Sequence, residues 1–118
     1  MIYRDTTETD IRRGCEAFLA TEKLLAYMGL AGDVHIDFDP DCAETIVYEP
    51  SVYSSICVVG PQEEGTGYNV TRHGENQFKY TAVSAAIAAV QMVIEWKVRH
   101  LPTIQPDHEA VNEMAESQ

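Results

Sequence analysis

The chain has 118 residues, of which 45% are hydrophobic and 23% charged, enough to bury a core as one globular domain. Its 19 Asp and Glu residues against 8 Lys and Arg give a formal net charge of −11. This balance argues against direct binding to nucleic acid or to anionic membranes, because both draw on clustered Lys and Arg. A basic protein partner fits the charge better.

Three cysteines, Cys15, Cys42 and Cys57, cannot all pair within one chain, and their spacing matches no zinc or redox motif. No apolar signal region follows Met1, and no run of 18 apolar residues occurs. We therefore expect a cytoplasmic protein with reduced thiols and no cofactor.

An N-terminal helix is predicted to begin where Thr7 is followed by Asp10, with a stop at Gly29 or Gly32. Thr21 and Glu22 could act as a second cap that divides this helix in two. The apolar residues that recur on one helical face are Ile11, Cys15, Phe18, Leu19 and Leu25.

From Asp33 the hydrophobic period changes to two, and strands are predicted at 34–39, 45–49, 54–59, 68–72 and 77–80. In the first of these, Ile36 and Phe38 alternate with His35, Asp37 and Asp39, which predicts one apolar and one very polar face. A loop over 60–67 and a hairpin turn over 73–76 separate the later strands.

The stretch 81–100 predicts a long, alanine-rich helix without Gly or Pro. Its predicted polar stripe comprises Ser84, Ala88, Gln91, Glu95 and Arg99. Its predicted core residues are Ile87, Val90 and Ile94, packed against Ile36, Phe38, Ile56 and Val58.

These elements predict an α+β fold: an antiparallel sheet of about four to five strands, with an N-terminal helix and the long C-terminal helix packed on it. We expect a single domain over 1–101. The remainder, 102–118, is a tail in which Ala110, Val111 and Met114 could share one face of a short helix.

The negative charge is concentrated in 33–78, which holds nine carboxylates and a single cation, Arg72. Tyrosines beside carboxylates can anchor a protein interface while the charges steer a basic partner. The leading hypothesis is a non-catalytic protein that binds a basic surface through Asp37, Asp39, Asp41, Glu44, Glu49, Glu63, Glu64 and Tyr68.

In its size, acidity and lack of a catalytic motif, the chain resembles the small phage-encoded inhibitors of bacterial defence, anti-CRISPR proteins among them. The resemblance implies a protein of a bacterial or phage-infected cell that blocks a nucleic-acid-binding surface by offering carboxylates in place of phosphates.

Enzymatic alternatives rest on two groups of residues. His35, Asp37 and Asp39 are neighbours on one strand face and could share a divalent cation, but a solvated outer face is the preferred explanation. Arg72-His73-Gly74 resembles the Arg-His-Gly run of the histidine phosphatases. This resemblance implies His73 as phosphoryl acceptor and Arg72 as phosphate clamp, whereas a hairpin turn explains the same residues.

A third alternative is a small-ligand-binding protein or a dimeric structural protein. It would use the apolar surface of the long helix, and a homodimer would then be the functional form.

Overall fold

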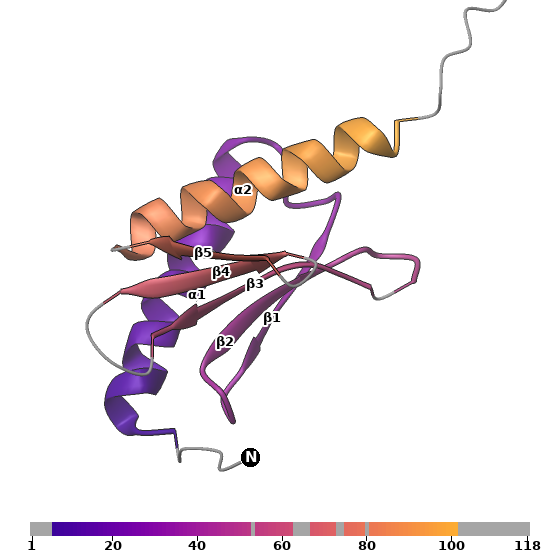
Figure 1. The fold of residues 1–118 in the computed structure, drawn as a ribbon. Helices are drawn as coiled ribbons and strands as arrows, with labels where there is room; N and C mark the ends of the chain where they lie inside the picture. Colours follow the sequence, from indigo (N-terminus) through magenta and orange to yellow (C-terminus); the bar gives the residue numbers. More distant parts are fainter. Residues whose placement is uncertain (1–5, 53, 63–66, 73–74, 80, 102–118) are drawn as a thin grey trace, which may run out of the picture.

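The computed structural model describes residues 6–52, 54–62, 67–72, 75–79 and 81–101 (Figure 1). Within them, two helices, α1 (Glu8–Tyr27) and α2 (Ala82–Arg99), flank five strands in the chain. The strands are β1 (His35–Asp39), β2 (Glu44–Tyr48), β3 (Ser55–Pro61), β4 (Tyr68–Arg72) and β5 (Glu75–Lys79). They form one antiparallel sheet in the order β1-β2-β3-β4-β5, which confirms the predicted α+β class. The predicted tail, 102–118, lies outside the described residues.

Reciprocal capping boxes begin both helices. In α1 the backbone N–H of Asp10 donates to Thr7 Oγ1, and the N–H of Thr7 donates to Asp10 Oδ2, each over 3.1 Å. In α2 Thr81 and Ser84 make the equivalent exchange. Two backbone donors that the helix cannot satisfy are thereby paired at each start. The predicted start at Thr7 is confirmed.

α1 is one continuous helix, so the predicted break at Thr21 is wrong. The hydroxyl of Thr21 donates to the carbonyl of Ala17 over 2.8 Å and thus bonds within the helix instead of capping a new one. Of the predicted apolar face, Leu25 is buried as expected, whereas Leu19 is half exposed and does not belong to it. The residues of α1 that are buried are Asp10, Gly14, Ala17, Thr21 and Leu25.

Both helices pack on the same face of the sheet (Figure 1). The strand register places Val47, Cys57, Val59 and Val70 together on this face, and all four are buried. The opposite face has no helix over it in the described part of the chain, and we call it the open face.

The face of α2 that meets the sheet differs from the predicted one. Val90 is 4% exposed as expected, but Ile87 is 46% exposed, and Ala88 from the predicted polar stripe is buried. Small side chains bring the helix close to the sheet, where Cys57 Sγ lies 3.9 Å from the carbonyl oxygen of Ala89. The buried residues of α2 are Ala85, Ala86, Ala88, Ala89, Val90, Met92 and Val93.

The predicted packing partners of α2 need a matching correction. Ile56 is buried in the core, and Ile36 packs against this core, so both lie on the helix side as predicted. Val58 instead pairs with Ile46 in the register and lies on the open face, so it cannot support α2. Neither α1 nor α2, the helices of the described residues, is long and apolar enough to cross a membrane.

Candidate functional site: an acidic hairpin

The β1–β2 hairpin, residues 35–48, carries four carboxylates and neither Lys nor Arg. We call it the acidic hairpin. Asp39 lies directly opposite Glu44 and Asp37 opposite Ile46, so alternation along both strands places Asp37, Asp39 and Glu44 on the open face. Asp41 is exposed in the connecting turn. Strand geometry and turn sequence together gather four negative charges at one edge of the sheet.

These carboxylates are not neutralised by ion pairs among the described residues. The ion pairs found there use Asp33, Glu49 and Glu95 as their acids. Two like charges directly opposite each other on a sheet are unfavourable, as in the pair of Asp39 and Glu44. The repulsion between Asp39 and Glu44 opposes folding, which favours a role for these carboxylates in binding.

The turn of the acidic hairpin has a defined local structure. The N–H of Asp41 donates to Asp39 Oδ1 over 2.9 Å, so one carboxylate orders the backbone that carries the next. Ala43 adopts a φ of 56°, in the left-handed region that non-glycine residues seldom occupy.

The close approach of α1 holds this turn in place. A Cβ added to Gly14 would lie 2.4 Å from the carbonyl oxygen of Ala43 and 2.9 Å from Phe38 Cε2, so only glycine fits. The hydroxyl of Thr6, just before α1, donates to the carbonyl of Asp41. Phe18 and Phe38 meet edge to face with their ring centroids 6.1 Å apart. The turn end of the hairpin is therefore docked on α1.

Burial and the negative charges of the acidic hairpin together raise the pKa of the Cys42 thiol. Desolvation is the largest cause that raises the pKa of this thiol to about 12, followed by its hydrogen bonds to Glu44 and Asp39 and by their negative charge. A thiol with this pKa is a poor nucleophile at neutral pH.

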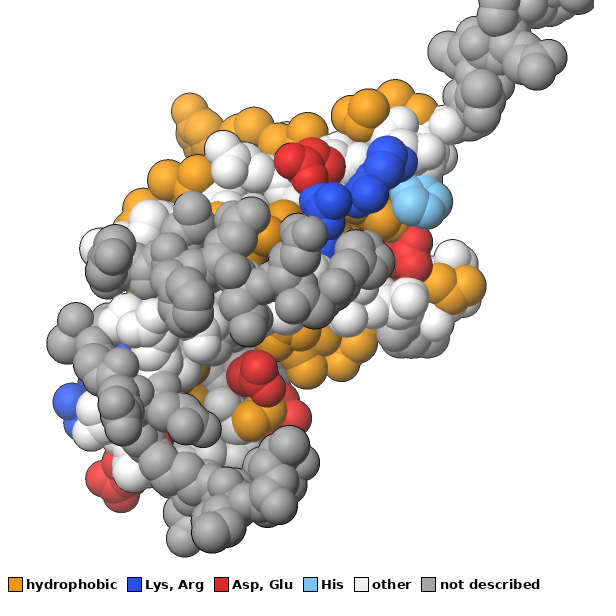
Figure 2. Space-filling view, viewed as in Figure 1, with side chains coloured by type: hydrophobic (Ala, Val, Ile, Leu, Met, Phe, Trp, Pro, Cys, Tyr) orange, Lys and Arg blue, Asp and Glu red, His pale blue; other side chains and the backbone are white. Residues whose placement is uncertain are grey.

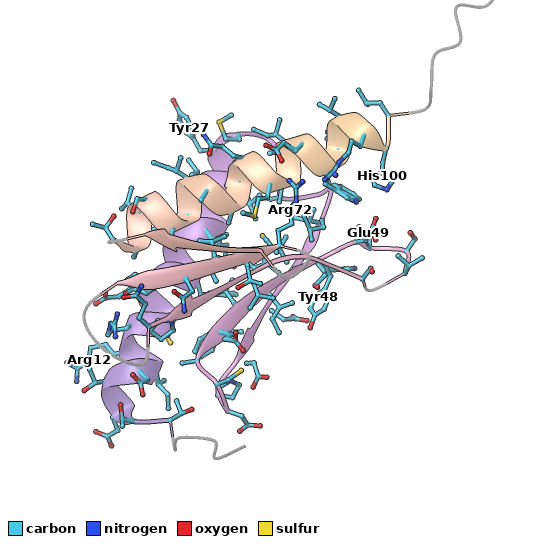
Figure 3. The ribbon with its side chains drawn as sticks, in the orientation of Figure 1. Arg12, Tyr27, Tyr48, Glu49, Arg72 and His100 are labelled. Atoms are coloured by element: carbon cyan, nitrogen blue, oxygen red, sulfur yellow. The ribbon has the colours of Figure 1, made fainter. Side chains whose placement is uncertain are left out.

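Apolar side chains lie beside the carboxylates on the open face. Ile46 and Tyr48 follow Glu44 on β2, and Val58 is the register partner of Ile46. All three are partly exposed. Figure 3 shows Tyr48 on the side of the strands away from α2, and in the lower half of Figure 2 acidic and hydrophobic side chains lie close together. The open face therefore combines charge with an apolar and aromatic contact area.

Two residues predicted to bind the partner lie elsewhere. Glu49 accepts a 2.6 Å hydrogen bond from Trp96 Nε1, and His100 Nε2 lies 3.8 Å from the same carboxylate oxygen. Figure 3 shows Glu49 and His100 together at the far end of the sheet from the acidic turn. This carboxylate therefore ties the end of β2 to the end of α2.

Tyr68 is 4% exposed and cannot form part of a surface. It lies on the helix-covered face, where its hydroxyl donates to the carbonyl of Arg13 over 3.0 Å and the Arg13 guanidinium stacks 5.1 Å from its ring centroid. Arg13 also donates to the carbonyls of Gln62 and Gly67, the two ends of the β3–β4 connection. Glu63 and Glu64 themselves lie outside the described residues.

The enzymatic alternatives find little geometric support. Across the described residues, no group of three or more His, Cys, Asp or Glu side chains is placed to hold a metal ion, so His35, Asp37 and Asp39 do not converge. Arg72 forms an ion pair with Glu95 of α2 (Figure 3), whereas His73 lies outside the described residues.

Some features of this site were not visible in the sequence. From the sequence, Gly14 only lowers the helix propensity of this segment. The position of Ala43 in the structure shows that the missing side chain of Gly14 allows the contact with the hairpin. The sequence predicts Glu49 to be a surface carboxylate. Its hydrogen bond with Trp96 could not be predicted, because the two residues are far apart in the chain. Comparisons with protein-family models, with curated proteins and with solved structures found no match for this chain.

Proposed function

We propose that this chain is a non-catalytic binding protein whose acidic hairpin occupies a basic, nucleic-acid-binding surface of a partner protein. The observation that carries the proposal is the gathering of Asp37, Asp39, Asp41 and Glu44 at one sheet edge without a neutralising ion pair among the described residues. Inhibition of a nucleic-acid-binding complex, as in the phage-encoded inhibitors, is the role that this arrangement favours.

The spacing of the charges suits such a surface. Alternate residues on a strand are about 7 Å apart, so Asp37 and Asp39 set two negative charges in a short row along β1. Nucleic acids also present a row of regularly spaced negative charges, and Lys and Arg side chains arranged to meet that row can meet this one. Exposed carboxylates steer the approach of a basic surface and accelerate association at low salt.

The apolar residues on the open face supply a contact area that a partner can bury. Exposed charges add affinity that depends on salt, whereas side chains buried at the centre of an interface add affinity that does not. Tyr48, Ile46 and Val58 lie next to the carboxylates and are only partly covered. The proposal thus assigns the attraction and the salt-dependent share of the affinity to the carboxylates, and the remaining affinity to these three side chains.

A capture experiment with charge-matched variants tests this proposal. The immobilised protein is used to capture partners from a bacterial lysate, and binding to the recovered protein is then measured with purified components. Asp37→Asn combined with Asp39→Asn removes two charges from the acidic hairpin. Glu8→Gln combined with Glu22→Gln removes the same charge from exposed positions on α1.

The hairpin variant should bind the partner at least tenfold more weakly, a loss of about 1.4 kcal/mol, because it removes part of the row of charges. The α1 variant should bind as the unmodified protein does. Equal binding by the two variants, or binding that does not change between about 50 and 200 mM salt, would contradict the proposal.

A further inference from the structure

A second surface, on the outside of the helix pair, is independent of the acidic hairpin. A groove of about 700 Å³ runs between α1 and α2, and we call it the helical groove. Leu19 and Tyr27 from α1 and Val83 and Ile87 from α2 form its walls. Hydrophobic side chains lie along the upper rim of the molecule, over the helices, in Figure 2.

These walls are unusually exposed for apolar side chains. Tyr27 is 85% exposed, Val83 64% and Leu19 50%, and Met28 beside them is nearly half exposed. They do not belong to the core, because α1 and α2 turn other residues toward the sheet. An apolar surface shared by two helices is typical of a protein–protein contact.

The charges at this surface favour a second copy of the chain as the occupant. Glu16 and Lys23, which also line the groove, lie seven residues apart on α1, about 10 Å along the helix. Leu19 and Ala20 fall between them. A twofold axis near these two residues would set two copies of α1 antiparallel, with each Glu16 facing Lys23 of the partner subunit. The surface is therefore complementary to itself in charge.

The rest of the molecule favours the same arrangement. A chain with a net charge of −11 repels its copies in most orientations. The groove is an exception, because its lining includes one acidic and one basic residue. Contact through the helices also directs the acidic hairpin of each copy outward, since its carboxylates lie on the open face.

The floor of the groove allows close contact. Ala20 and Ala86 line it, so nothing larger than a methyl group protrudes from these two positions. Small residues at such positions let helices approach closely and receive larger side chains from the facing helix. From these observations we infer that the helical groove is the interface of a twofold homodimer in which the α1 helices pack antiparallel. This inference does not depend on the proposed function.

Charge exchange tests the geometry directly. Molar mass is measured by light scattering or sedimentation over about 1 to 100 μM, a range typical of modest protein–protein affinity. The unmodified chain should dimerise. Glu16→Lys alone and Lys23→Glu alone should each raise the dimer Kd about tenfold or more, because each replaces two attractions with two repulsions. Glu16 also accepts a long, 3.5 Å hydrogen bond from Tyr68, so circular dichroism should confirm that each variant is folded.

Two combinations make the result specific. The double exchange, Glu16→Lys with Lys23→Glu, should restore dimerisation, and a mixture of the two single variants should form heterodimers although neither dimerises well alone. Val83→Asp should weaken the dimer, whereas Val52→Asp, at a residue of nearly equal exposure (65%) outside the groove, should not. A chain that stays monomeric throughout this range would overturn the inference. A dimer that is indifferent to the charge exchanges and to Val83→Asp would overturn it equally.

Discussion

The acidic hairpin and the helical groove face opposite directions and are built on different principles. The hairpin collects charge by strand alternation, and its position depends on contacts with α1, of which the approach of Gly14 to Ala43 is one. The groove collects apolar side chains because α2 packs on the sheet through its alanines, which turns larger residues such as Ile87 outward. We propose a basic partner for the first surface and a second copy of the chain for the other. The two surfaces should therefore be separable by mutation.

The largest expected effect distinguishes the core face of α2 from its groove face. Val90→Asp would bury an unpaired carboxylate and should unfold the protein, a cost of about 4 kcal/mol or more. Ile87→Asp, one turn away on the exposed side, should cost less than about 1 kcal/mol. Thermal melting followed by circular dichroism measures both. If the two variants melted alike, the assignment of the two faces would be wrong.

The next effect concerns the contact that docks the acidic hairpin on α1. Gly14→Ala forces a Cβ against the carbonyl oxygen of Ala43 and should destabilise the protein by about 2 kcal/mol. This loss would occur although alanine favours helix by about 1 kcal/mol. Gly32→Ala is the control, because its added Cβ meets nothing within 4 Å. Urea denaturation should show no comparable loss there, and a stabilised Gly14→Ala variant would refute the close contact.

A smaller and opposite effect is expected at Thr45 of β2. Its side chain is wholly buried, and Oγ1 has no hydrogen-bond partner among the described residues. Thr45→Val keeps the shape and removes the unpaired hydroxyl, so stability should rise by about 1 kcal/mol. Denaturant titration measures the change. A clear loss of stability would mean that this hydroxyl is paired.

The smallest effect is a change in the alkylation rate of Cys42, which depends on the negative charge of the acidic hairpin. Stability should stay nearly unchanged. Thiolate is the reactive form, so a pKa of about 12 means that alkylation of Cys42 is slow at pH 9 and accelerates as the pH rises toward 12. Asp39→Asn with Glu44→Gln removes negative charge, lowers the Cys42 pKa and should speed alkylation severalfold. Cys57 is the internal control, because burial alone raises its pKa to about 12. Peptide mass spectrometry that showed no change at Cys42 would contradict the clustering of carboxylates around it.

The two surfaces also differ in how far the sequence could predict them. Alternation along His35–Asp39 identified the polar face of β1, because period two in a strand allows only two faces. The apolar residues of α2 surround most of the helix, so periodicity could not distinguish Ile87 on the groove from Val93 in the core. Tyr68 could not be assigned to a face either, because only the pairing of β4 with β3 places it under α1.

The central claim is that the acidic hairpin occupies a surface that otherwise binds nucleic acid, and competition measures this most directly. A fluorescent duplex is bound to the captured partner, and the protein is titrated in while fluorescence anisotropy is followed. The unmodified chain should displace the duplex, and Asp37→Asn with Asp39→Asn should require at least tenfold more protein, whereas Glu8→Gln with Glu22→Gln should behave as unmodified. A partner that bound the duplex and the protein at the same time, or equal displacement by both variants, would contradict the claim.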